Sequence, residues 1–100
     1  MGQMDRAIIW TAPAKNDIQQ ITSYWNNRNK SNAYSLKLQK IIKEKLAFIN
    51  RFPLIGIQTD YPNARCFIIR DYKLFYAVTE EAIIVLRFWD TRQNPNKLKG

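Results

Sequence analysis

The fold of this chain is decided near its C-terminal end, by the stretch RCFIIRDYKLFYAVTEEAIIVLRFWDTRQNP at residues 65–95. It contains three apolar runs: RCFIIR (65–70), YKLFYAV (72–78) and IIVLRFW (83–89). Runs rich in β-branched and aromatic residues, separated by polar turns, are typical of consecutive strands. The connections at Asp71 and at residues 79–81 are short enough for hairpins. The stretch therefore predicts three antiparallel strands. The polar residues that occur within these strands are mostly arginine and lysine.

The N-terminal part of the chain predicts one more strand and a first helix. The contiguous apolar run within residues 6–10 indicates a short strand, which Pro13 closes. After Pro13 the apolar side chains recur at helical spacing, so we expect an amphipathic helix that ends in the polar cluster at residues 26–29. These apolar residues are Ile18, Ile21 and Trp25.

A second, longer helix is predicted from about Ser31 to Asn50, with Ser31 as its N-cap. Its apolar stripe comprises Tyr34, Leu38, Ile41, Ile42, Ile49 and Phe52. Its opposite, polar face carries Lys37, Lys40, Lys43, Glu44 and Arg51. Two helices joined by a short polar turn form an antiparallel hairpin, and the apolar stripe must be buried against the following strands.

The segment at residues 53–64 is rich in proline, glycine, aspartate and asparagine, so we expect a loop there. The sequence therefore predicts an α+β fold with an N-terminal strand and a two-helix antiparallel hairpin packed on a mostly antiparallel four-stranded sheet. A chain of 100 residues is long enough for one core. We expect a single domain over residues 1–100, with residues 1–5 and 94–100 mobile.

Composition narrows the possible chemistry and predicts the cellular compartment. The chain has 16 Lys and Arg against 8 Asp and Glu, a formal net charge of +8, and no histidine. Catalysis through a histidine and metal sites built on histidine are therefore excluded. Glu80 and Glu81 belong to a turn and the other carboxylates, Asp17 included, are isolated, so we expect no metal and no cofactor. One cysteine and no membrane-spanning run predict a cytoplasmic protein that does not enter a membrane.

A basic and aromatic constellation remains as the candidate functional surface. It comprises Arg65, Arg70, Lys73, Arg87 and Arg92, interleaved with Phe67, Tyr72, Phe75, Tyr76, Phe88 and Trp89. If one sheet face carries the arginines, they suit phosphates and the aromatic rings suit unpaired bases. The structural alternative is that the aromatic residues fill the core and the arginines form a solvated face. A basic binding module for nucleic acid or protein, without toxicity, is compatible with the same residues.

The order of elements and their motifs resemble the RelE/ParE superfamily of bacterial toxins. The resemblance rests on YKLFY (72–76) in the middle strand, LRFWDTR (86–92) at the end, and the helix at residues 33–46. It implies a growth-arresting toxin of a type II toxin–antitoxin pair, with a role in plasmid stabilisation or stress response. It also implies a cognate antitoxin as partner.

Two activities divide the superfamily, and each implies different residues here. RelE-like members are metal-independent endoribonucleases that cut messenger RNA on the ribosome, and Arg70 and Arg92 fall at or beside their catalytic arginines. ParE-like members inhibit DNA gyrase and are not enzymes. The ending at residues 86–92 favours the ParE-like branch, and no tyrosine follows Tyr76 to supply the catalytic tyrosine of the RelE-like branch. Candidate target- or RNA-binding residues are Arg65, Lys73, Arg87 and Trp89.

The antitoxin is expected to be acidic where it binds and to lie across the groove of the helical hairpin or along a sheet edge. An exposed basic stripe on the second helix, formed by Lys37, Lys40 and Lys43, would attract such a partner. A solvated helix face explains the same three lysines.

Overall fold

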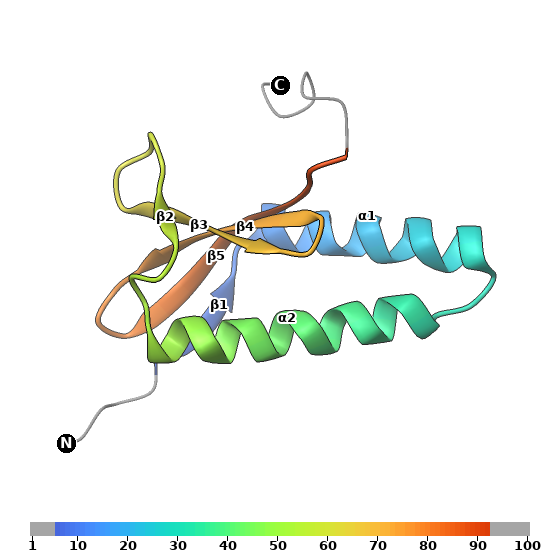
Figure 1. Ribbon diagram of the computed structural model, residues 1–100, viewed down its shortest axis with the longest axis horizontal. Coiled ribbons are helices and arrows are strands. Elements are labelled where there is room, and N and C mark those ends of the chain that lie inside the picture. The colour runs from blue at the N-terminus through green and yellow to red at the C-terminus, as the bar shows by residue number, and fades with distance from the viewer. Residues whose placement is uncertain (1–5, 93–100) are drawn as a thin grey trace.

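The computed structural model of the chain describes residues 6–92, and the expected mobility of residues 1–5 and 94–100 lies outside this range. The α+β architecture predicted from the sequence is confirmed (Figure 1). In chain order the elements are β1 (Ala7–Trp10), α1 (Ala12–Asn29), α2 (Ala33–Arg51), β2 (Ile57–Gln58), β3 (Ala64–Ile69), β4 (Tyr72–Val78) and β5 (Ala82–Asp90).

The sheet has five strands in the order β1-β5-β4-β3-β2, one more than the four predicted. The three C-terminal strands are antiparallel, as expected, and β1 joins the sheet by pairing in parallel with β5. The additional strand is β2, which pairs Ile57 with Cys66 and Gln58 with Arg65 inside the segment predicted as a loop. The last residue of the segment, Ala64, begins β3, and the loop prediction holds for residues 53–56 and 59–63.

The segment that contains β2 is fixed to the sheet by Tyr76. The Tyr76 hydroxyl donates to the carbonyl of Pro53 at 2.8 Å and accepts from the backbone N–H of Gly56 at 2.9 Å. A Cβ atom at Gly56 would lie 2.7 Å from the Tyr76 hydroxyl oxygen, so only glycine allows this approach. These two bonds hold the chain beside β3, where two residues can pair as a strand.

The helices begin and end close to the predicted positions. α1 starts one residue before Pro13, rather than after it, because proline is tolerated in the first turn, where its missing N–H has no helical partner. The Thr11 side chain caps α1 by accepting from the N–H of Ala14 at 3.2 Å. α2 begins at Ala33, later than predicted, and the hydroxyl of Ser31 accepts from the N–H of Ala33 at 3.1 Å.

The core lies between the helical hairpin and one face of the sheet. Strand residues that face the helices include Tyr72, Leu74, Tyr76, Ile83, Val85 and Phe88, all at most 1% exposed. The α2 stripe contributes Leu38, Ile42, Leu46 and Ile49. Phe52 was predicted in this stripe and is instead 49% exposed, because α2 ends at Arg51 and the chain turns away.

The free edge of β5 is closed by residues of α1. Because β1 ends at Trp10, opposite Val85, the last residues of β5 have no strand on that side. Thr11 donates through its hydroxyl to the carbonyl of Leu86 at 3.0 Å. The carboxylate of Asp17 accepts from the backbone N–H of Phe88 at 3.0 Å, so a helix side chain replaces the missing strand.

Asp17 also forms a bidentate ion pair with Arg87. Arg87 Nε and Nη2 donate to the two carboxylate oxygens at 2.7 and 2.9 Å. The Asp17 side chain is only 10% exposed, whereas that of Arg87 is 43% exposed. The prediction that Asp17 is an isolated surface carboxylate is therefore wrong, because its partners lie about seventy residues later in the chain and no local pattern reveals them.

Replacing Asp17 tests this anchor. Asp17→Ala should lower the free energy of unfolding by about 2–4 kcal/mol, because it leaves the Phe88 N–H without a partner and Arg87 without its counter-charge. Urea titration of the purified chain measures the change. The matched control is Asp60→Ala in the exposed loop, with an expected change within about 0.5 kcal/mol. Equal losses in both variants would show that Asp17 does not anchor α1.

Candidate functional site

The predicted binding residues do not share one face of the sheet. Lys73 pairs with Trp89 and Phe75 pairs with Arg87, so these four side chains belong to the face away from the helices. Arg65 pairs with the buried Tyr76 and belongs to the opposite face. The expectation that one face carries the arginines is therefore wrong, because the strand register and the bulge at Leu86 separate them.

Arg65 is engaged by the fold. Its guanidinium donates to the carbonyl of Gly56 at 2.8 Å and to that of Leu54 at 3.2 Å. It thereby supports the same segment that the Tyr76 hydroxyl holds. The structure gives Arg65 a positioning role next to the β2 segment, while its use as a contact to a target remains a prediction.

Trp89 lies between a cation and an aromatic ring on the exposed face. The Arg87 guanidinium lies 5.2 Å from the centre of the Trp89 ring, and Phe75 meets that ring edge-on at 4.9 Å. The Asp17 carboxylate raises the pKa of Arg87, which therefore stays charged. Lys73 is exposed opposite Trp89. The result is a half-open aromatic and basic surface formed by Lys73, Phe75, Arg87 and Trp89.

The structure brings the two candidate catalytic arginines to the same end of the sheet. Arg70 and Asp71 form the turn between β3 and β4, and Arg70 adopts a left-handed conformation with φ 55°. The backbone N–H of Thr91 donates to the carbonyl of Asp71 at 2.8 Å, so the residues after β5 lie against this turn. Arg70 is exposed there.

Arg92 is held by two carboxylates and two aromatic rings. It donates to both oxygens of Asp90 at 3.0 Å and lies 3.6 Å from the carboxylate of Asp71. Its guanidinium is 5.3 Å from the centre of the Trp25 ring and 5.7 Å from that of Tyr72. The Asp90 contact raises the pKa of Arg92. The Arg92 side chain is 46% exposed, and the bidentate pair with Asp90 balances its charge.

Tyr72 is a buried tyrosine beside Arg92. Its hydroxyl shares a hydrogen bond of 3.1 Å with that of Tyr34, and its ring stacks on Phe88 at 5.0 Å. Burial, followed by the bond to Tyr34, raises the pKa of Tyr72 well above its usual value. Tyr72 is therefore harder to deprotonate than an exposed tyrosine, which makes it a poor general base.

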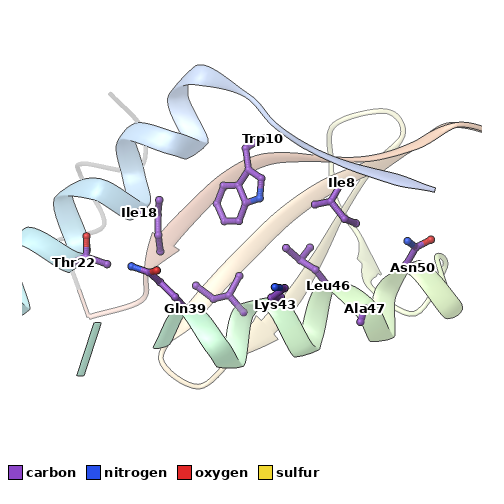
Figure 2. A pocket seen from close by; sticks show the side chains of 10 residues that line it. Ile8, Trp10, Ile18, Thr22, Gln39, Lys43, Leu46, Ala47 and Asn50 are labelled. Carbon is purple, nitrogen blue, oxygen red and sulfur yellow. The ribbon is translucent and has the colours of Figure 1, made fainter. Parts of the chain in front are cut away.

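An apolar groove lies between the helical hairpin and β1, so the hairpin groove expected from the sequence is also lined by the first strand (Figure 2). It has a volume of about 650 Å³. Its apolar lining comes from three elements: Ile8 and Trp10 of β1, Ile18 of α1, and Ile42, Leu46 and Ala47 of α2. Polar side chains also line it, and Lys43 is the one cation among them. The sequence did not identify the lining residues, because they come from three elements that only the fold brings together.

The described residues show neither a metal site nor a membrane-spanning helix. Across residues 6–92, no three or more Cys, Asp or Glu side chains gather as ligands for a metal ion. The two helices in this range are too polar to cross a bilayer.

Comparison with known proteins identifies the family. The sequence profile described as the ParE toxin of the type II toxin–antitoxin system parDE matches residues 8–95. No curated protein matches the chain by sequence.

Solved structures share the fold at low sequence identity. The chromosomal ParDE toxin–antitoxin system of P. aeruginosa has a TM-score of 0.73 at 17% identity, covering 88% of this chain and 98% of the other. The RelBE2 toxin–antitoxin complex of Mycobacterium tuberculosis has a TM-score of 0.60 at 14% identity, covering 85% and 96%. The DinJ-YafQ toxin-antitoxin complex of E. coli has a TM-score of 0.55 at 12% identity, covering 87% and 93%.

The raised pKa of Tyr72 predicts a loss of stability at alkaline pH. Unfolded tyrosine ionises near pH 10, whereas folded Tyr72 keeps its proton, so raising the pH above about 10 favours the unfolded state. The free energy of unfolding should fall by up to about 1.4 kcal/mol per pH unit on account of Tyr72. Urea titrations between about pH 9 and pH 11 measure this slope.

Tyr72→Phe should make that slope shallower, whereas Tyr61→Phe, on an exposed loop, should leave it unchanged. An identical slope in wild type and Tyr72→Phe would contradict the buried, protonated state of Tyr72.

Proposed function

This chain belongs to the ParE toxin family of type II toxin–antitoxin systems, and on that premise we propose that it arrests growth by inhibiting DNA gyrase. The family match covers residues 8–95 and includes the strand ending that favours the ParE-like branch. A gyrase inhibitor acts in the cytoplasm and needs no cofactor.

One observation favours gyrase inhibition over RNA cleavage: the Arg92 guanidinium is paired with carboxylates of the same chain. A RelE-like nuclease uses cationic groups to neutralise the charge that develops on the scissile phosphate. Here the Arg92 guanidinium is already bound by Asp90 and lies close to Asp71. Releasing it for a phosphate would break a bidentate charge-assisted pair, which is among the stronger hydrogen-bonded contacts in proteins. The geometry therefore supports a structural role for Arg92.

A ribosome-dependent nuclease is the second candidate, and one observation favours it. Arg70 is exposed on the turn whose Asp71 carbonyl accepts from the backbone N–H of Thr91, so Arg70 and Arg92 belong to the same corner of the sheet. The net charge of +8 would also favour binding to the ribosome. Against this candidate, Tyr72 is buried and its pKa is raised, which makes it a poor general base.

We place the cognate antitoxin in the groove between β1, α1 and α2. The P. aeruginosa ParDE, M. tuberculosis RelBE2 and E. coli DinJ-YafQ structures are described as toxin–antitoxin systems or complexes, which supports an antitoxin partner for this chain. The groove has the size and apolar lining to accept large side chains from an amphipathic helix. Lys43 lies in its lining, and Lys40 is exposed on the same helix. An acidic amphipathic segment of the antitoxin would place its apolar side chains in the groove and its carboxylates near Lys43 and Lys40.

Paired assays on the purified chain test the target. We expect the wild-type chain to inhibit supercoiling of plasmid DNA by gyrase and to leave messenger RNA intact in a reconstituted translation system. The double variant Arg70→Ala/Arg92→Ala should leave messenger RNA equally intact. Ribosome-dependent cuts in phase with the codons, lost in the double variant, would establish the nuclease instead. No effect in either assay from folded protein would favour the non-toxic binding module.

A charge reversal tests the antitoxin site. Lys43→Glu should weaken the complex with the co-encoded antitoxin by about tenfold or more, because it places a carboxylate against an acidic segment. Lys37→Glu, an equal charge change on the same helix outside the groove, should weaken it by less than about threefold. Titration calorimetry measures both affinities. Equal effects of the two variants would contradict binding in the groove.

A further inference from the structure

The outward face of α1 has an unusual chemical make-up. From Lys15 to Arg28 its exposed side chains are amides, hydroxyls and cations: Lys15, Asn16, Gln19, Gln20, Ser23, Tyr24, Asn27 and Arg28. Four of the amides, Ser23 and Tyr24 surround one shallow hollow along the helix. The function proposed above uses none of these residues.

This face carries cations without opposing carboxylates. The only acidic residue of α1 is Asp17, which is buried and neutralised by Arg87. The ion pairs found within residues 6–92 involve Arg87 or Arg92 and none involves Lys15, Arg28 or the adjacent Lys30. The face is therefore positively charged at both ends, through Lys15 and Arg28. Between them it carries uncharged amide and hydroxyl groups that can form hydrogen bonds.

That arrangement matches the major groove of duplex DNA. Lys15 and Arg28 are thirteen residues apart, or about 20 Å along the helix. B-DNA has a major groove about 12 Å wide, which admits an α-helix whose ends meet the phosphates on either side. Asparagine and glutamine side chains are suited to the base edges, because an amide donates to and accepts from adenine at once. Duplex RNA is a poor fit, since its major groove is deep and narrow.

We propose that α1 binds duplex DNA, with the amides of Asn16, Gln19, Gln20 and Asn27 at the base edges and Lys15 and Arg28 at the phosphates. Charge complementarity supports this occupant, since the chain has a net charge of +8 and the α1 face carries no exposed carboxylate to repel phosphates. The proposal is independent of gyrase as the target, because the interaction needs only this chain and DNA.

The test is a fluorescence anisotropy titration of the full chain against a labelled DNA duplex of about 20 base pairs, which is roughly two helical turns. A duplex RNA of the same sequence serves as the competing ligand. Two variants carry the same change in charge: Gln20→Glu on α1 and Gln58→Glu on β2, both at exposed positions. Thermal unfolding of each variant checks that the fold is intact.

We expect Gln20→Glu to weaken DNA binding by about tenfold and Gln58→Glu by less than about twofold, because only the first places a carboxylate against the duplex. Lys15→Ala should also lower the slope of log affinity against log salt by about 1, and Lys37→Ala on α2 should not. Equal losses in both glutamate variants, equally tight binding of duplex RNA, or no DNA binding at low salt would each overturn the proposal.

Discussion

The carboxylate of Asp17 is the contact on which the rest of this structure depends. β1 is too short to cover β5, and beyond Val85 the strand would expose unpaired backbone groups at its edge. Asp17 pairs with the N–H of Phe88 and with the Arg87 guanidinium, so α1 is held along that edge. Because α2 follows α1 through a tight turn at Lys30, the same contact positions the whole hairpin over the sheet. The groove between the hairpin and β1 follows from that position.

Three of the four arginines predicted as catalytic or binding residues also form contacts that stabilise the fold. Arg87 binds Asp17, Arg65 holds the segment around β2, and Arg92 joins Asp90 to the aromatic cluster of Trp25 and Tyr72. A guanidinium suits such positions because it makes several directed hydrogen bonds while staying charged. Within residues 6–92, the exposed cations that form no ion pair include those of the two helices, Lys30 on the turn between them, Lys73 on the open sheet face and Arg70 on its turn. We therefore expect these exposed cations to make most of the charge contacts with partners.

The sequence predicted what local patterns encode. The apolar and aromatic run at 72–78, bounded by polar turns, predicted β4, and the helical spacing from Ile18 to Trp25 predicted α1. The contacts that build the candidate site join distant parts of the chain, such as Asp17 with Arg87 or Gly56 with Tyr76, and no periodicity signals them. The bulge at Leu86 shifted the register and decided which face carries Arg87. The lining of the groove joins β1 to both helices, which is a property of packing.

The central claim is that a ParE-family fold in which Arg65, Arg87 and Arg92 bind other groups of the same chain acts on gyrase. The most direct measurement is equilibrium binding of the fluorescently labelled chain to purified DNA gyrase, with ribosomes offered in a parallel titration. The account predicts a saturable complex with gyrase that the co-encoded antitoxin prevents, and only weak, salt-sensitive association with ribosomes. Saturable binding to ribosomes with no complex on gyrase would contradict it.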